Sequence, residues 1–395
     1  DSGAATFSDS DAETGFAADI DYLRYGNKTR ASLPQLEAYS NKVLDRLTAQ
    51  WPGRRASVRV YITPSPDFQA YTLEHGAIFV SLGSLQIIRN EDELAALLAH
   101  EFSHAALRHH SKDVLEKFSN TAFRFANLYL QTRMESGRDV QNRARALKVA
   151  GWVSEKALFP SWNSGQENEA DILGTDLLVR AGYNADAMIA VLKKVQATAQ
   201  QKQEFIAENP IKVDRDSSDT PVLLSVDLEL FAKNVVGSLE DSLAKQYAEA
   251  AERQKRVREY LKREYRQRER PELDASNYQA VLEKSSIKAR VEQYQHAFRA
   301  EEFLLEDDGV AKAAAAAAGS IGGAIGDDPY TRMLMYRIRD FQNEARKANI
   351  NLQKAYDSNI APMYTYELLV DKAVKQSDYS SAESLLQEMD RIFDQ

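Results

Sequence analysis

The chain has 395 residues, of which 44% are hydrophobic and 28% charged, so it is long and apolar enough to bury a sizeable core. Its net charge of −9 argues against a protein that binds nucleic acid or anionic membranes in general. Because it contains no cysteine, disulfide frameworks and cysteine-ligated zinc sites are excluded, and any metal must be held by histidine and carboxylate side chains.

The N-terminal part of the chain predicts a short arm, a helix and a small sheet. Residues 1–18 are small, polar and acidic, and we expect a flexible arm there. Helical periodicity predicts a helix from Pro34 to Leu47. Alternating β-branched residues predict a strand from Ala56 to Thr63, and two further strands, Phe68–Leu73 and Gly76–Leu82, should form a pair across a short turn.

The next predicted helix runs from Leu94 to His110, because its apolar residues recur at helical spacing. Asn90 is the expected N-cap, with Glu93 as its capping-box partner. The strand that precedes this helix, at Ala77–Ser81, is expected to bind an extended peptide through its main chain.

This helix carries an H-E-x-x-H motif at residues 100–104. On a helix, His100 and His104 lie one turn apart on one face and can share a metal ion. Glu101 projects to the side, where it can take a proton from a water held by the metal. The alternative is an amphipathic helix with two partly buried histidines.

Further helices are predicted at Lys112–Met134, Val140–Lys156, Gln166–Arg180, Ala185–Ala197 and Leu239–Glu269. The last of these is long and mixes both signs of charge. Its basic residues, Arg253 among them, are expected to lie on a solvated face and not in an anion site.

The C-terminal part contains an unusual segment and a faint repeat. Residues 311–326 are Ala- and Gly-rich, and we expect a mobile linker that is too short and too weakly apolar to span a membrane. Beyond it, five positions recur at an offset of 34 residues, the period of the tetratricopeptide repeat: Tyr330, Thr331, Leu334, Ala348 and Leu352 match Tyr364, Thr365, Leu368, Ala382 and Leu386. Two unrelated helical hairpins are the alternative, because the Trp, Gly and final Pro of that repeat are missing.

A catalytic zinc site needs a third protein ligand, and His110 is the first candidate. It has the spacing of the metzincin pattern, H-E-x-x-H-x-x-G-x-x-H. That pattern requires Gly where Leu107 stands, and a helix that continues through Leu107 would turn His110 away from the metal. We therefore interpret His109 and His110 as residues at the helix end, suited to the helix dipole.

A better candidate lies on the predicted helix at 166–180. Glu167 and Asp171 are four residues apart and share a face, so Glu167 can ligate a metal while Asp171 accepts the N–H of a ligating imidazole. Two alternatives stay open from spacing alone. Ser164 and Glu167 can form a capping box, or Glu169 can be the ligand.

Three segments resemble the minigluzincin family, which contains the HtpX protease, the CAAX prenyl proteases and the periplasmic BepA-type proteases. They are GAIFVSLGSL, NEDELAALLAHEFSHAALRH and ENEADILGTDLL, within residues 55–200. The resemblance implies that the first Glu of E-x-x-A-D, Glu167, is the third ligand and that Asp171 supports it. BepA-type members have a Ser-x-His-Pro segment, but no histidine stands near Ala244–Tyr260 and the only later one is His296. The resemblance therefore does not extend to self-inhibition by a histidine plug.

These observations predict an α+β fold that is mostly helical. A small antiparallel or mixed sheet should lie beside the motif helix, followed by an all-α, tetratricopeptide-like region. The expected domains are a flexible arm at 1–18, a metalloprotease domain at 19–270 and a helical domain at 271–395 with an insertion at 311–326.

The predicted function is that of a zinc metalloendopeptidase of the gluzincin type, with one zinc ion held by His100, His104 and Glu167. Glu101 is the predicted general base, and Asp171 orients a ligand. Proteins or peptides are the expected substrates, and the C-terminal helices are expected to bind a protein partner. We expect a periplasmic or otherwise exported protein, with its signal sequence removed, that acts in envelope quality control and touches membranes peripherally at most. The alternatives are a chaperone or assembly factor with a largely latent protease site, and a structural metal-binding helical protein.

Overall fold

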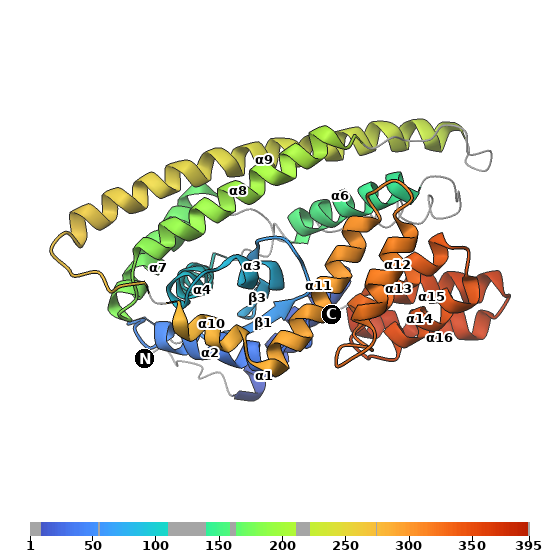
Figure 1. The fold of residues 1–395 in the computed structure, drawn as a ribbon, viewed down its shortest axis with the longest axis horizontal. Helices are drawn as coiled ribbons and strands as arrows, with labels where there is room; N and C mark the ends of the chain where they lie inside the picture. Colours follow the sequence, from blue (N-terminus) through green and yellow to red (C-terminus); the bar gives the residue numbers. More distant parts are fainter. Residues whose placement is uncertain are drawn as a thin grey trace, which may run out of the picture.

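The computed structural model describes residues 9–53, 56–109, 140–158, 163–210, 222–273 and 275–393. Figure 1 shows a mostly helical molecule with a small sheet near its centre, which confirms the predicted fold class. The helix predicted at Lys112–Met134 and the side chain of His110 lie outside the described residues.

The sheet has three strands, β1 (Arg59–Thr63), β2 (Ala70–Thr72) and β3 (Ala77–Ser81), in the order β1-β3-β2. β1 runs parallel to β3 and β2 runs antiparallel to it, so the sheet is mixed. The central strand, β3, thus has a partner on each side.

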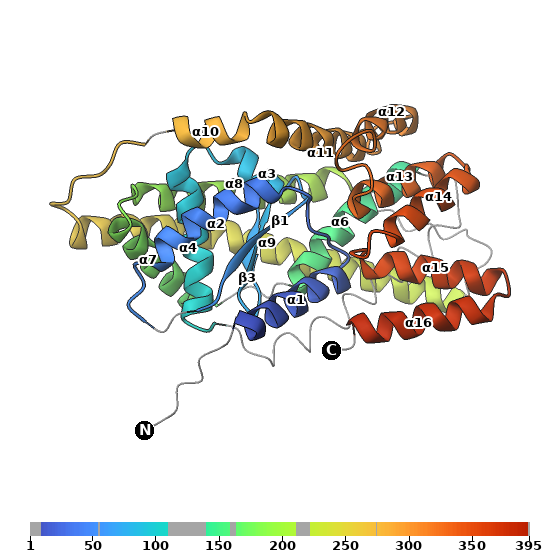
Figure 2. The ribbon, with the colours of Figure 1, turned by 90° about the horizontal axis from the view of Figure 1, so that it is seen from below.

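Alternate side chains of the strands enter two different apolar clusters. Val60, Ile62 and Ile78 pack against helices α2 (Pro34–Thr48) and α4 (Glu91–Ala106). The opposite face, with Tyr61 and Phe79, packs against helix α1 (Asp9–Tyr25), which Figure 2 shows beside the sheet. The prediction of a flexible arm is therefore wrong for residues 9–18, because apolar side chains of α1 cover a hydrophobic face of the sheet.

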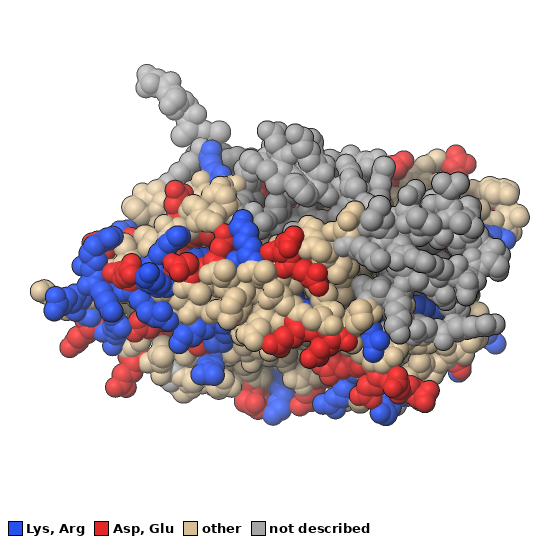
Figure 3. Space-filling model, turned by 90° about the horizontal axis from the view of Figure 1, so that it is seen from above, with Lys and Arg blue, Asp and Glu red and all other residues tan. Residues whose placement is uncertain are grey.

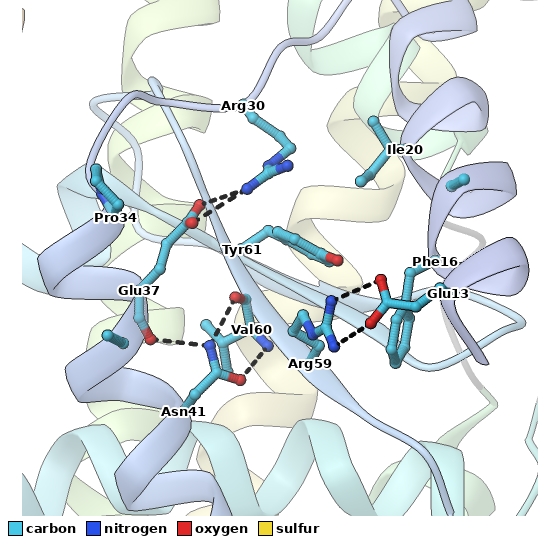
Figure 4. A pocket seen from close by; sticks show the side chains of 12 residues that line it. Glu13, Phe16, Ile20, Arg30, Pro34, Glu37, Asn41, Arg59, Val60 and Tyr61 are labelled. Atoms are coloured by element: carbon cyan, nitrogen blue, oxygen red, sulfur yellow. Dashed lines mark hydrogen bonds and ion pairs between the residues drawn. The ribbon is translucent and has the colours of Figure 1, made fainter. Parts of the chain in front are cut away.

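Side chains of α2 cover the outer edge of β1. Asn41 donates to the carbonyl of Val60 and accepts from its N–H, and Glu37 accepts from the N–H of Ile62. Figure 4 shows these contacts in a cavity of about 440 Å³ between α1, α2 and β1, whose two arginines, Arg30 and Arg59, are paired with carboxylates. This edge of the sheet is therefore not available for a further strand.

Helix α4 begins as predicted and ends earlier than predicted. The Asn90 side chain accepts the N–H of Glu93 and caps the first turn. The helix ends at Ala106 with Leu107 as its C-cap, and Arg108 adopts a left-handed conformation with φ of 54°. The prediction that Leu107 continues the helix is wrong, since the chain turns at Arg108 without a glycine.

The remaining elements of this part are helices α3 (Leu82–Ile87), α6 (Val140–Leu158), α7 (Ser164–Arg180), α8 (Asp186–Glu208) and α9 (Val222–Glu264). Helices α8 and α9 run side by side along one face of the molecule (Figure 1). Helix α7 has a capping box formed by Asn163 and Gln166. The alternative in which Ser164 and Glu167 form that box is therefore wrong, and the cap does not use Glu167.

Basic side chains gather at the end of the molecule where α9 finishes (Figure 3). Lys255, Arg256, Lys262 and Arg263 are exposed there, as expected of a solvated face. Arg253 is the exception, because its side chain turns inward and is almost fully enclosed.

The C-terminal part is helical throughout its described residues: α10 (Ser276–Leu282), α11 (Ser285–Phe303), α12 (Val310–Ser320), α13 (Pro329–Phe341), α14 (Ala345–Tyr356), α15 (Met363–Lys375) and α16 (Tyr379–Phe393). The prediction of a mobile linker at 311–326 is wrong over α12, because Ala313 and Ala317 are fully buried against neighbouring helices. Tyr278 and Tyr294, from α10 and α11, belong to the same core as α2 and α4. The domain boundaries themselves stay a prediction.

The 34-residue offset recurs in the helices. Helix α15 begins 34 residues after α13, and α16 begins 34 residues after α14. Thr331 and Thr365 are both fully buried at equivalent positions, whereas Leu352 is buried and Leu386 is exposed. Two consecutive helical hairpins of equal length are thus present, and their assignment as tetratricopeptide repeats stays a prediction. Among the described helices, none combines the length and the apolarity that crossing a membrane requires.

Helices α4 and α7 approach each other closely at Gly174. A Cβ at this position would lie 3.2 Å from the backbone nitrogen of His100 and 3.2 Å from the carbonyl carbon of Ala99. Only a residue without a side chain therefore permits this contact between the backbones of the two helices.

We predict that Gly174→Ala lowers the free energy of unfolding by about 1–3 kcal/mol, because the added methyl group forces the two helices apart. Gly151→Ala is the matched control, since a Cβ at that helical position meets nothing within 4 Å. That substitution should raise stability by about 0.5–1 kcal/mol through helix propensity. Urea unfolding measures both variants, and equal effects of the two substitutions would contradict the prediction.

Candidate metal centre

Three predicted side chains, His100, His104 and Glu167, come together between α4 and α7. Their ligating atoms all lie within 4.8 Å of one another. The two Nε2 atoms are 3.1 Å apart, and the Glu167 carboxylate oxygens lie 3.5 Å from Nε2 of His100 and 3.7 Å from Nε2 of His104. Glu167 thus faces both imidazoles, whereas Glu169, the alternative ligand, points elsewhere and is largely exposed.

Glu101 lies beside this cluster on α4 and is buried. The hydroxyl of Thr72, on β2, lies 3.0 Å from its carboxylate Oε2 and can donate to it. Burial raises the pKa of Glu101 to about 7, against the lowering effects of His100 and Thr72. A carboxylate with a pKa near neutrality can both accept and release a proton at physiological pH.

Asp171 lies one turn beyond Glu167 on α7 and is 1% exposed. Its Oδ1 is 3.0 Å from Nδ1 of His100, the ring nitrogen opposite the one that faces Glu167. Burial alone would raise the pKa of Asp171, but Arg253 and His100 outweigh burial and lower that pKa to about 2. Asp171 is therefore a charged carboxylate placed to hold the His100 ring.

Arg253 of α9 is the feature of this centre that the sequence prediction missed. Its Nε and Nη2 donate to the two oxygens of Asp171 at 2.7 and 2.8 Å, and its Nη1 lies 2.5 Å from Glu167. The prediction that it lies on a solvated face is wrong. One signal was present in the sequence, because Arg253 continues the four-and-three spacing of Gln246 and Ala250 on the inward side of α9.

His109 is likewise not a solvent-facing residue at the helix end, as the sequence suggested. It is buried, and its Nδ1 lies 2.8 Å from Nδ1 of His104. Its Nε2 lies 3.2 Å from Glu169. The left-handed turn at Arg108 brings this ring back against α4, which helical periodicity could not reveal.

A cleft of about 260 Å³ leads to the cluster. One wall is the segment Phe68–Tyr71, and the opposite wall is formed by apolar side chains of α8 together with part of α9. His100, Glu101 and Glu167 lie along this cleft, so an extended chain in it would pass the cluster.

The donor set fits a divalent cation. Two imidazoles and one carboxylate are the ligands of a gluzincin-type zinc site, which leaves the fourth position open. The buried carboxylates of Glu101, Glu167 and Asp171 face one guanidinium, that of Arg253, so the cluster carries an excess of negative charge when the carboxylates are ionised. A cation between the donor atoms would offset this excess.

The strand beside the cleft is β2 and not β3. The prediction that Ala77–Ser81 binds an extended peptide is wrong, because β3 is paired on both sides and has no free edge. Gln69 and Leu73 form main-chain hydrogen bonds with Ser81 and Ala77 of that strand. Antiparallel pairing alternates, so the N–H and C=O of Ala70 point away from β3.

Comparison with known proteins supports a metallopeptidase. Residues 34–218 match peptidase family M48. The chain is 25% identical over 176 residues to the beta-barrel assembly-enhancing protease of Yersinia pestis, covering 43% of this chain and 36% of that protein. It is 26% identical over 187 residues to the mitochondrial metalloendopeptidase OMA1 of Schizosaccharomyces pombe, covering 46% of this chain and 51% of that protein.

A third relative is the metalloprotease YcaL of Escherichia coli, 25% identical over 186 residues, which cover 47% of this chain and 69% of that protein. The chain thus spans about a third of the first relative and about half of the second. The resemblance to metalloproteases of the beta-barrel assembly-enhancing type, predicted from the three segments, is confirmed.

We predict that Arg253→Gln lowers the free energy of unfolding of the metal-free protein by about 3–5 kcal/mol, because it leaves two buried carboxylates without their counter-charge. Arg256→Gln removes an exposed charge from the same helix and should change stability by no more than about 0.5 kcal/mol. Chemical denaturation measures both variants. A loss below about 1 kcal/mol for Arg253→Gln would show that the buried guanidinium does not stabilise the centre.

Proposed function

We propose that this chain, whose residues 34–218 match peptidase family M48, is a zinc-dependent endopeptidase that cleaves protein substrates. The observation that carries the proposal is the convergence of His100, His104 and Glu167 at the end of a cleft that also holds Glu101. In the proposal, the first three side chains are the zinc ligands and Glu101 is the general base. A bound zinc ion supplies a Lewis acid that lowers the pKa of water and polarises a peptide carbonyl.

Glu101 is given the proton-transfer role because of its position and environment. It is buried beside the cluster, and Thr72 can orient its carboxylate. Glu101 takes a proton from water as the oxygen–carbon bond forms and delivers it to the amine nitrogen as the carbon–nitrogen bond breaks. Asp171 and Arg253 keep the ligand side chains oriented during this step.

The outer edge of β2 is proposed to hold the substrate in extended conformation. Ala70 lies in the wall of the cleft, and its N–H and C=O point away from β3. A peptide paired there through its main chain would run past Glu101 and His100 with little dependence on its side chains.

An envelope or organelle quality-control role is proposed from the printed names of the relatives, one of which is a beta-barrel assembly-enhancing protease. The two hairpins α13–α14 and α15–α16 favour a second activity, the binding of a protein partner. A chaperone or assembly factor with a largely latent protease site is therefore the alternative proposal. A periplasmic or otherwise exported location belongs to the same proposal.

We predict that Glu101→Gln lowers kcat for cleavage of an unfolded protein substrate at least about 10²-fold, because the amide cannot accept the proton. Zinc content should remain one ion per chain, since Glu101 is not a proposed ligand. Glu204→Gln, an exposed residue of α8, is the control and should leave kcat unchanged.

Cleavage at the wild-type rate by zinc-loaded Glu101→Gln protein would exclude the proposed mechanism. Loss of cleavage together with intact binding of a protein partner would assign that binding to the C-terminal helices and support the chaperone alternative.

We predict that Ala70→Pro lowers kcat/KM about 3- to 10-fold, because proline removes the N–H that would pair with the substrate. Zinc content should be unchanged. Ala70→Ser keeps the N–H and should retain most of the activity. Equal kcat/KM for the proline and serine variants would show that this edge does not hold the substrate.

A further inference from the structure

We infer that His109, itself held by Glu169, is a positioning residue that fixes the ring of His104, an inference that rests on the zinc site proposed above. The three side chains form a continuous line. Nδ1 of His104 lies 2.8 Å from Nδ1 of His109, and Nε2 of His109 lies 3.2 Å from Oε2 of Glu169.

The two ring nitrogens of His104 face different partners. Its Nε2 faces His100 and Glu167, and its Nδ1 faces His109. A neutral imidazole that ligates through Nε2 carries its proton on Nδ1. His104 therefore donates to His109, which must accept on Nδ1 and so carries its own proton on Nε2.

Glu169 completes this order of protons. Its carboxylate is the acceptor for the Nε2–H of His109 and thereby selects the His109 tautomer that can accept from His104. Two successive hydrogen bonds thus hold one tautomer and one orientation of the His104 ring. Glu169 is 64% exposed, so the line ends at the protein surface.

The two histidine ligands are supported in different ways. His100 faces a buried carboxylate, Asp171, which Arg253 holds in place. The ring of His104 is fully buried and faces a second imidazole instead of a carboxylate. Carboxylates and carbonyls are the usual partners of a ligating imidazole, so this imidazole pair is a specific feature of the present site.

The backbone holds His109 in this position independently of its ring. The N–H of His109 donates to the carbonyl of His104 at 3.0 Å, after the left-handed turn at Arg108. The side chain of Gln166, in the cap of α7, donates to the carbonyl of His109 at 3.3 Å. The ring is therefore held between α4 and the start of α7, beside both segments that supply the proposed ligands.

The test compares zinc affinity and cobalt spectra of full-length variants. Each protein is stripped of metal, titrated with zinc against a chromophoric chelator, and then loaded with Co²⁺ to record its visible absorption. His109→Leu fills similar space and removes the acceptor, whereas His109→Asn keeps an acceptor oxygen near the position of Nδ1. His296→Leu, an exposed histidine of α11, is the control.

The expected result is an affinity for zinc about 10- to 100-fold weaker in His109→Leu, with shifted Co²⁺ bands. His109→Asn should recover most of the affinity and the wild-type spectrum. Glu169→Ala should weaken zinc binding in the same direction but less, and His296→Leu should behave as wild type. Since Glu169 is exposed, its variant keeps the test decisive if His109→Leu does not fold.

Wild-type affinity and spectrum in both His109→Leu and Glu169→Ala would overturn the inference. So would His109→Asn as weak as His109→Leu, because the ring would then act through packing alone. His100→Ala separates the two levels of the argument. If it loses zinc while His109→Leu does not, the positioning role alone fails; if it binds zinc as the wild type does, the proposed zinc site and this inference both fail.

Discussion

The close contact between α4 and α7 is the constraint on which the rest of the centre depends. The two helices meet at Gly174, where the absence of a side chain lets α7 approach the backbone of His100. Glu167, Asp171 and Gly174 follow helical spacing, so one stripe of α7 both packs against α4 and presents carboxylates to its histidines. A site assembled across two rigid helices is held more exactly than one on loops, which suits chemistry that depends on fixed ligand positions.

Burying several carboxylates in one place requires compensating charge. Arg253 supplies one part, since it contacts both Glu167 and Asp171 from a third helix. That contact also ties the long α8–α9 hairpin to the centre, because α9 carries Arg253 and packs along α8. The remaining negative charge is what a divalent cation would offset. The fold and the electrostatics of the centre are therefore one problem, since the elements that enclose the cleft also supply its charges.

Local patterns predicted those features that depend on short stretches of chain. The motif helix, its Asn90 cap and the three strands follow from periodicity and capping, and the pairing of Glu167 with the histidines followed from spacing and resemblance. Contacts between distant segments could not be predicted in this way. The charge of Arg253 indicated solvent, and only its register on α9 hinted at burial. The strand order of the sheet, which leaves β2 and not β3 with a free edge, depends on packing by α2. The turn at Arg108, without a glycine, concealed the return of His109 to α4.

The central claim is that His100, His104 and Glu167 together bind one metal ion. Anomalous diffraction at the zinc absorption edge, from crystals of the full-length chain grown with zinc, tests it directly. The account predicts one strong peak about 2.0–2.2 Å from Nε2 of His100, Nε2 of His104 and a carboxylate oxygen of Glu167. A peak held by His109 and Glu169 instead, or no peak between α4 and α7 at saturating zinc, would contradict it.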